Sequence, residues 1–191
     1  MSLHQQLMTA GLIPRVEERE VFLLAEGSAH EALRARLEFH DTPHRSLWRL
    51  EGQSALEKHA PLLFTLAPDS TLDDWLGSIR ATLPLTVLSS RLAFDDLWRH
   101  LRRFSKFQDA ESRYWLRLGD PSALERYVGS LAYEPGRLAR FFDLGGIDAL
   151  YFLDSRIGLA RQAQPLFEQA LGNAERDGCL IWRDIELGEG C

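Results

Sequence analysis

The sequence predicts an α/β fold in which a mixed β-sheet alternates with helices and the C-terminal lobe is more helical. Short apolar runs, too short to be helices, alternate with amphipathic stretches along the chain, which is the order expected when helices cover a sheet. The chain has 191 residues, 45% of them hydrophobic and 26% charged. One compact unit of this size buries a core without disulfides or metal.

The first ninety residues predict strands and helices in turn. Val21–Ala25 is an apolar run of strand length. Ser28 precedes Glu31 by three positions, the spacing of a capping box, and predicts a helix that ends near His40. Further strands are expected at Ser46–Leu50 and Leu83–Ser89, and further helices starting at Ser54 and at Ser70 or Thr71. Pro61–Ala67 is apolar enough for a central strand or a core-facing turn.

The strongest helical pattern extends from Arg91 to about Lys106. Its apolar side chains recur at helical spacing and form one continuous stripe, made of Phe94, Leu97, Trp98, Leu101 and Phe104. After it, Tyr114–Leu118 predicts a strand, and Asp120-Pro121 predicts a helix start, because aspartate is a good N-cap and proline suits the first helical position.

The last third predicts more helix than strand. We expect helices at Pro135–Phe142 and Ala160–Arg176, a strand at Ala149–Leu153, and an edge strand at Leu180–Ile185. The predicted organisation is an N-terminal segment (1–19), an α/β domain (20–155) and a helical C-terminal extension (156–191) packed on the same unit.

Charge, cysteines and hydropathy limit the classes of function and the compartment. The net charge of −6 argues against a general nucleic-acid binder. Cys179 and Cys191 form no metal-ligand pair and fit a reducing compartment. The N-terminus has no secretory signal pattern, and no apolar run reaches the length of about 20 residues that spans a bilayer. We therefore expect a soluble cytoplasmic protein without a membrane partner.

Candidate catalytic chemistry is sparse. His40 and Asp41 are adjacent, as His and Asp are in metal-dependent phosphohydrolases, and His44 follows His40 by four positions. That spacing aligns two ligands only on a helix, and Pro43 interrupts one. Cys179 has no histidine after it and is expected to be a structural thiol. We expect no catalytic residue, metal or cofactor; a metal-dependent hydrolase or nuclease with a cryptic His/Asp site stays the alternative.

Basic residues gather on the helix predicted at Arg91–Lys106. Five of them stand against two aspartates there: Arg91, Arg99, Arg102, Arg103 and Lys106 against Asp95 and Asp96. The cluster is either a solvated helix face or an electropositive surface that receives an acidic segment or a helix C-terminus of a partner. Nucleic acid is not favoured, because the aromatic stripe faces inward rather than interleaving with the arginines.

Three motifs follow one another in a fixed order: His100-Leu101-Arg102-Arg103-Phe104, then Tyr114-Trp115-Leu116-Arg117-Leu118, then Asp120-Pro121. This ordered series resembles the effector-adaptor family of type VI secretion systems of Gram-negative bacteria. Ser46-Leu47, Ala60-Pro61-Leu62-Leu63 and Ser89 also fit, and the resemblance covers roughly residues 20–155. Two positions depart from it: Gly119 stands where an aromatic residue is usual, and Ser122 stands where arginine is usual.

The resemblance implies a non-enzymatic adaptor, or chaperone, that needs no cofactor. Such proteins bind a cognate toxic effector and help load it onto the VgrG spike. The expected partner-binding residues are Arg99, Arg102, Arg103 and Arg117, and His100, Asp120 and Pro121 are expected to serve the structure. Arg117 has two possible uses, a contact with a partner or an internal pair with Asp120.

Overall fold

One antiparallel β-sheet organises the chain. The computed structural model describes residues 1–13, 19–48, 55–108, 110–154, 158–166 and 175–187. Its main sheet has eight strands in the order β2-β3-β1-β4-β7-β8-β10-β9, and all neighbouring strands are antiparallel. The strands are β1 (Glu20–Glu26), β2 (His44–Ser46), β3 (Pro61–Thr65), β4 (Leu85–Ser90), β7 (Ile147–Asp154), β8 (Leu159–Pro165), β9 (Glu175–Asp177) and β10 (Leu180–Glu186).

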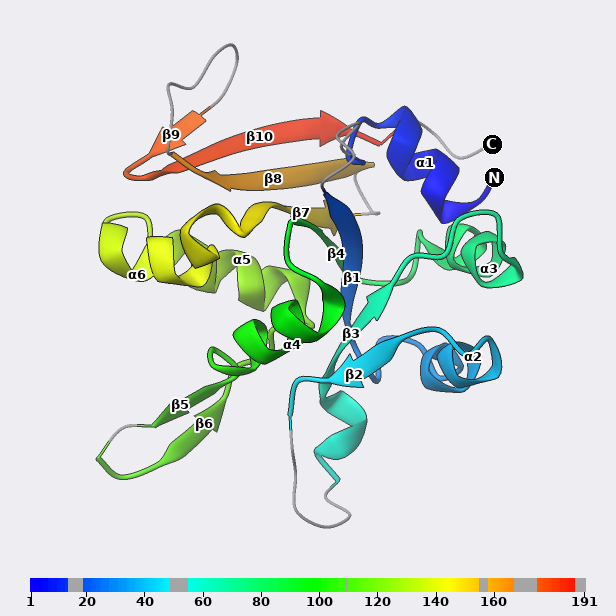
Figure 1. Ribbon diagram of the computed structural model, residues 1–191, viewed down its shortest axis with the longest axis horizontal. Helices are drawn as coiled ribbons and strands as arrows, with labels where there is room; N and C mark the ends of the chain where they lie inside the picture. The colour runs from blue at the N-terminus through cyan, green and yellow to red at the C-terminus, as the bar shows by residue number, and fades with distance from the viewer. Residues whose placement is uncertain (14–18, 49–54, 109, 155–157, 167–174, 188–191) are drawn as a thin grey trace.

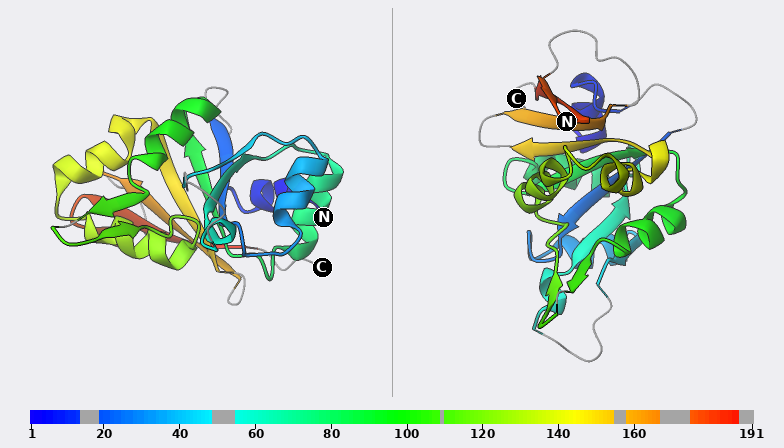
Figure 2. Two further views of the ribbon diagram at one scale, coloured as in Figure 1. Left: turned by 90° about the horizontal axis from the view of Figure 1, so that it is seen from below. Right: turned by 90° about the vertical axis from the view of Figure 1, so that its left-hand side faces the viewer.

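Helices cover both faces of this sheet (Figure 1). One face carries α1 (Leu3–Thr9), α2 (Leu33–Phe39) and α3 (Thr71–Ile79), and the other carries α4 (Phe94–Arg102), α5 (Pro121–Ser130) and α6 (Pro135–Phe141). Two short 3-10 helices are η1 (Glu57–His59) and η2 (Asp143–Gly145). The left view of Figure 2 shows the two helical groups on opposite sides of the strands.

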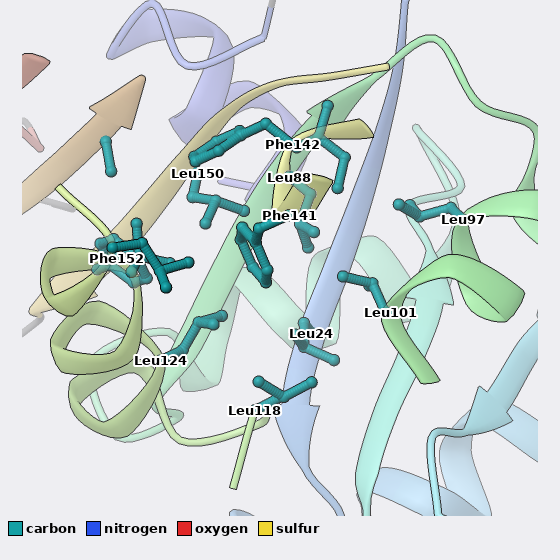
Figure 3. Close-up of a cluster of buried hydrophobic side chains, with 14 of the residues drawn as sticks. Leu24, Leu88, Leu97, Leu101, Leu118, Leu124, Phe141, Phe142, Leu150 and Phe152 are labelled. Carbon is teal, nitrogen blue, oxygen red and sulfur yellow. The ribbon is translucent and has the colours of Figure 1, made fainter. Parts of the chain in front are cut away.

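Alternation along the strands gives each face its own core. In β1, Phe22 and Leu24 pack on the side of α4, α5 and α6, whereas Leu23 and Ala25 pack on the side of α1, α2 and α3, as expected where successive side chains point to opposite faces. In the first cluster the side chains of α5 and α6 lie against those of the strands (Figure 3). Because both faces are covered, the central strands are apolar throughout rather than alternately polar.

A second, two-stranded sheet projects from the body as a hairpin (Figure 1). It consists of β5 (Lys106–Gln108) and β6 (Arg113–Trp115) and follows directly after α4. The helix predicted at Arg91–Lys106 is therefore shorter at both ends, and Lys106 belongs to a strand. The strand predicted at Tyr114–Leu118 is also shifted, since β6 ends at Trp115.

Two helix starts follow local capping chemistry. The Ser70 hydroxyl accepts from the backbone N–H of Asp73 at 3.1 Å and begins α3. The Asp120 carboxylate accepts from the N–H groups of Ser122 and Ala123, and Pro121 is the first helical residue of α5. Both predicted starts are confirmed.

The predicted start of α2 is wrong. Ser28 lies in a turn, and α2 begins at Leu33 after Ala32, whose side chain makes no cap. The Ser28 hydroxyl instead donates to Glu26 Oε1 at 2.9 Å, so it does not cap the helix. The predicted end near His40 is confirmed, because His40 is the C-cap. The helix expected from Ser54 starts outside the described residues; within them only η1 follows.

The mixed α/β class is confirmed, but a more helical C-terminal lobe is not observed. The helix expected at Ala160–Arg176 is wrong over its first residues, which form β8, and over its last two residues, which belong to β9. The first of these stretches is rich in residues with good helix propensity, but β7 and β10 pair with it on both sides and satisfy its backbone. Residues 167–174 and Cys191 lie outside the described residues, and the three-part domain division stays a prediction.

The predicted strand at Leu180–Ile185 exists as β10, but it is not at the edge. It pairs with β8 on one side and with β9 on the other. The strand predicted at Ser46–Leu50 corresponds to β2, which ends at Ser46. Within the described part of the chain, the helices are all too short or too polar to cross a bilayer.

Candidate functional site

Basic side chains on α4, β2 and β5 form a surface that we call the basic face, made of Arg45, Arg99, Arg102, Arg103 and Lys106. Trp98 organises it. The guanidinium carbon of Arg102 lies 4.6 Å from the centroid of the Trp98 ring, and that of Arg45 lies 4.9 Å from it. The ring is fixed in turn, because Trp98 Nε1 donates to the backbone oxygen of Ser46 at 2.9 Å.

Only part of the basic face is neutralised by carboxylates. Arg99 pairs with Asp96 at 2.6 Å, and Arg45 pairs with Asp95 at 3.1 Å. Among the residues that the structure describes, no carboxylate lies within ion-pair distance of Arg102 or Arg103. Both remain free to receive an anionic group, and Arg102 is held in place by its stacking on Trp98.

The adjacent hairpin adds exposed aromatic rings. Phe107 and Tyr114 are opposite each other on β5 and β6, with ring centroids 6.1 Å apart, and are 55% and 49% exposed. Lys106 lies over the Trp115 ring, with Nζ at 4.5 Å from the centroid. Sequence reasoning missed Phe107 and assigned Tyr114 only to a predicted strand. A strand as short as β6 gives no periodicity from which its exposure could be read.

A groove lies at one end of the main sheet, and we call it the sheet-end groove. It has a volume of about 1090 Å³. Its walls come from the end of β1, the segment before β4, the end of β7, the first residues of β8, the end of β10, and the loop and first turns leading into α5. None of the residues of the basic face lines it.

Arg117 lies in this groove and not with the arginines of α4. Its Nε and Nη2 donate to Glu26 Oε2, at 3.1 Å and 2.5 Å, and Nη2 lies 3.3 Å from Asp120 Oδ2. The internal pair with Asp120 that the sequence suggested is present, but Glu26 is the nearer partner. The structure thus separates Arg117 from Arg99, Arg102 and Arg103, with which it was predicted to form one surface.

Glu26 is the residue of this cluster that sequence reasoning missed. Its side chain is 11% exposed at the end of β1. Burial alone raises the pKa of Glu26, but the hydrogen bonds from Arg117, Ser28 and His59 outweigh it, and the pKa lies below its ordinary value. The hydrogen bond to Glu26 likewise raises the pKa of Arg117. The available signal was a glutamate directly after an otherwise apolar strand.

Ser28, His59 and Glu26 meet, but not as a catalytic relay. His59 Nδ1 lies 2.7 Å from the Ser28 hydroxyl and 3.0 Å from Glu26 Oε1. In a nucleophile–base–acid relay the two ring nitrogens serve different partners, whereas here one nitrogen faces both. The Ser28 hydroxyl also donates to Glu26 Oε1. Ser28 and His59 therefore both hold the Glu26 carboxylate in position.

His100, which was expected to serve the structure, is buried and packed in the core. His100 is 6% exposed, its Nε2 lies 2.8 Å from the backbone oxygen of Phe141, and its ring packs on Phe104. Gly119 also has a structural reason: a Cβ there would lie 2.6 Å from Ala25 O and Glu26 N. An aromatic side chain, which the resemblance would favour at this position, does not fit without moving β1.

The candidate metal and thiol residues are placed as follows. His44 Nδ1 lies 2.7 Å from the backbone oxygen of Thr42, and His40 Nδ1 lies 3.4 Å from the Thr71 hydroxyl. Over the described ranges, no three His, Cys, Asp or Glu side chains gather in a metal-binding arrangement. Cys179 is partly buried and packs against the core on the α5 and α6 side.

Comparison with known proteins gives one match. A family model described as "Domain of unknown function (DUF4123)" matches residues 21–135. The match extends from β1 into the start of α6 and includes the whole basic face, Arg117 and Asp120. No curated protein and no solved structure matches the chain. Strands β7 to β10, which complete the sheet and the second wall of the groove, lie outside the matched residues.

Proposed function

Because the chain belongs to the DUF4123 family, which is associated with type VI secretion effector adaptors, we propose that it is such an adaptor. In this proposal the protein is a non-enzymatic chaperone that binds a cognate toxic effector in the cytoplasm and helps load it onto the VgrG spike. The observation that carries the proposal is the family match over more than half of the chain, including the basic face.

The basic face is the surface we assign to the effector. Arg102 and Arg103 have no carboxylate partner in the described part of the chain, so an acidic segment that binds there displaces no internal ion pair. Stacking on Trp98 leaves the N–H edge of the Arg102 guanidinium available for planar, paired hydrogen bonds to a carboxylate. Electrostatic attraction between an acidic effector segment and this face would also accelerate their encounter.

The hairpin offers the apolar part of the same interface. Phe107 and Tyr114 are exposed aromatic residues beside the arginines, and interfaces are enriched in aromatic residues and arginine. An effector segment that carries both acidic and apolar side chains matches this combination. The expected effector contact therefore extends from α4 onto β5 and β6.

Co-expression with the products of the neighbouring genes tests the proposal. The tagged full-length chain is expected to co-purify with a toxin-like protein, and the pair is expected to associate with a VgrG spike protein added afterwards. Size-exclusion chromatography with light scattering then gives the stoichiometry. Purification of the chain alone from every such co-expression, with a folded protein by circular dichroism, would contradict the adaptor function.

A further inference from the structure

We infer that the sheet-end groove is a second binding site, which takes a basic, extended segment of a partner protein. The inference rests on the proposed function only in taking the ligand to be part of a protein.

The walls of the groove are built by rigid elements. Strand ends from β1, β7, β8 and β10 meet there because the sheet is antiparallel, so the end of each strand lies beside the start of its neighbour. Apolar side chains provide part of the lining, among them Leu83, Phe152 and Leu153, which are almost completely buried. A hollow on such a framework keeps its shape in the absence of a ligand.

The charge of the groove selects the ligand. Among the described residues, five carboxylates line it, those of Glu26, Asp120, Glu125, Asp154 and Asp184, against the two guanidiniums of Arg117 and Arg161. Both guanidiniums are already engaged: Arg117 with Glu26 and Asp120, and Arg161 with Glu125 at 2.9 Å and with Asp184 at 4.0 Å. The excess negative charge disfavours an acidic ligand and favours a cationic one.

The size and the lining favour a segment of chain over a small cation. The volume of about 1090 Å³ exceeds the usual range of about 300–1,000 Å³ for small-molecule sites. The walls carry both carboxylates and apolar side chains, and arginine and lysine combine an apolar stem with a charged head. A segment in which basic and apolar residues alternate therefore satisfies both kinds of surface.

A peptide titration tests the inference without the natural partner. The probe is a fluorescein-labelled hexapeptide of alternating arginine and leucine, and the reference is the same peptide with glutamine in place of arginine. Fluorescence anisotropy with the full-length protein is expected to give a Kd for the arginine peptide at least about tenfold lower than that for the glutamine peptide. Equal affinity for the two peptides overturns the inference.

Charge-reversed variants locate the binding. Asp154→Arg combined with Asp184→Arg is expected to weaken binding of the arginine peptide at least about tenfold. Glu38→Arg combined with Asp74→Arg changes the net charge equally at exposed positions of α2 and α3 outside the groove and is expected to leave the Kd within about twofold. Equal losses in the two double variants would mean that the peptide senses only net charge, which overturns the site.

Two further measurements keep the test decisive. Asp184→Arg alone changes a side chain that is 69% exposed. It is therefore expected to leave the circular dichroism spectrum unchanged while still weakening binding of the arginine peptide. Free arginine amide is expected to displace the labelled peptide at least about a hundredfold less well than unlabelled peptide does. Equal competition would assign the groove to a small cation and overturn the inference that it binds a segment of chain. The pull-down of the effector is independent of these outcomes, so a failed groove leaves the adaptor proposal standing.

Discussion

The basic face and the sheet-end groove both present arginine to solvent, but the two arginine sets have different partners. Arg102, at the end of α4, stacks on an aromatic ring, and neither it nor the C-cap Arg103 has a carboxylate partner among the described residues. Arg117 and Arg161 lie among carboxylates and are paired with them. The first surface is therefore positive and the second negative, although guanidiniums are prominent in both.

Arginine content alone does not fix the sign of a surface. Glu26 and Arg117 are 91 positions apart in the chain and meet only because the loop after β6 passes the end of β1. A partner at that distance is invisible to any local pattern. The two surfaces together would allow one protein to hold an acidic and a basic segment at the same time.

The strongest change is expected in the loop that lines the groove. Gly119→Ala would place a Cβ 2.6 Å from the backbone of β1. Because the backbone must shift to make room for this atom, the substitution is expected to lower the free energy of unfolding by about 2–3 kcal/mol. Gly136→Ala is the matched control, because a Cβ there meets nothing within 4 Å. Urea unfolding measures both; equal stability of the two variants would contradict the close packing of this loop.

The next effect concerns the basic face. Arg102→Glu with Arg103→Glu is expected to weaken capture of the effector roughly tenfold to thirtyfold, or about 1.4–2 kcal/mol, and to leave binding of the arginine peptide unchanged. The matched control is Arg36→Glu with Arg140→Glu, at exposed positions of α2 and α6 outside the basic face. Biolayer interferometry compares the pairs, and similar losses from both would remove the basic face from the interface.

This control reproduces the chemistry of the tested pair as well as its charge. Arg36 lies over the Trp75 ring, with its guanidinium carbon 5.5 Å from the centroid, much as Arg102 lies over Trp98. Both double variants therefore reverse two positive charges and remove one stacking contact. A difference in effector capture between them is due to the position of the arginines and not to net charge or lost stacking.

The third prediction concerns the contribution of the Glu26 carboxylate to stability. The pKa of Glu26 is lowered in the folded protein. As the pH falls, the Glu26 carboxylate is therefore protonated in the unfolded chain before it is protonated in the folded protein. The stabilisation is complete above the unfolded value of about 4.3 and is lost as the pH falls through the folded pKa. Glu26→Gln is expected to cost about 1 kcal/mol at pH 7, discounted for the exposure of Arg117, and less at about pH 3.

Urea unfolding at the two pH values checks this expectation, with Glu38→Gln as the control at an exposed position of α2. That control is expected to change stability by less than about 0.5 kcal/mol. A Glu26→Gln deficit that stays the same at both pH values would show that the carboxylate contributes through packing and not through its charge.

The smallest effect is expected for Arg99, which, unlike Arg102 and Arg103, already has an ion-pair partner among the described residues. Arg99 already pairs with Asp96, and both side chains are more than half exposed. Arg99→Gln is therefore expected to change stability by less than about 0.5 kcal/mol and effector affinity by no more than about threefold. Interferometry with the same effector measures it; a loss as large as that of the Arg102 and Arg103 variant would mean that the Asp96 pair opens on binding.

Sequence reasoning succeeded where the determinants are local. Asp120-Pro121 and Ser70 begin helices through hydrogen bonds to residues two or three positions away, and the apolar strands β1, β3 and β4 follow from their composition and length. The basic residues of α4 were also identified correctly as solvent-facing, since they lie off the apolar stripe.

It failed where a distant contact competes with a local preference. Ser28 has the spacing of a helix cap, but its hydroxyl donates to Glu26. The residues from Ala160 have good helix propensity, but the strands on both sides draw them into the sheet. Sequence reasoning left Arg117 with two possible uses and found its pair with Asp120, but it missed Glu26, the nearer partner, which lies 91 positions away.

The walls of the groove come from residues as far apart in the chain as Glu26 and Asp184. The N-terminal part of a protein leaves the ribosome first and begins to fold while synthesis continues. A nascent chain that has not yet reached β7 carries only one wall of the groove, and the other wall appears when β7, β8 and β10 pair. A basic segment that binds as proposed would therefore find both walls of the groove only after β10 has joined the sheet.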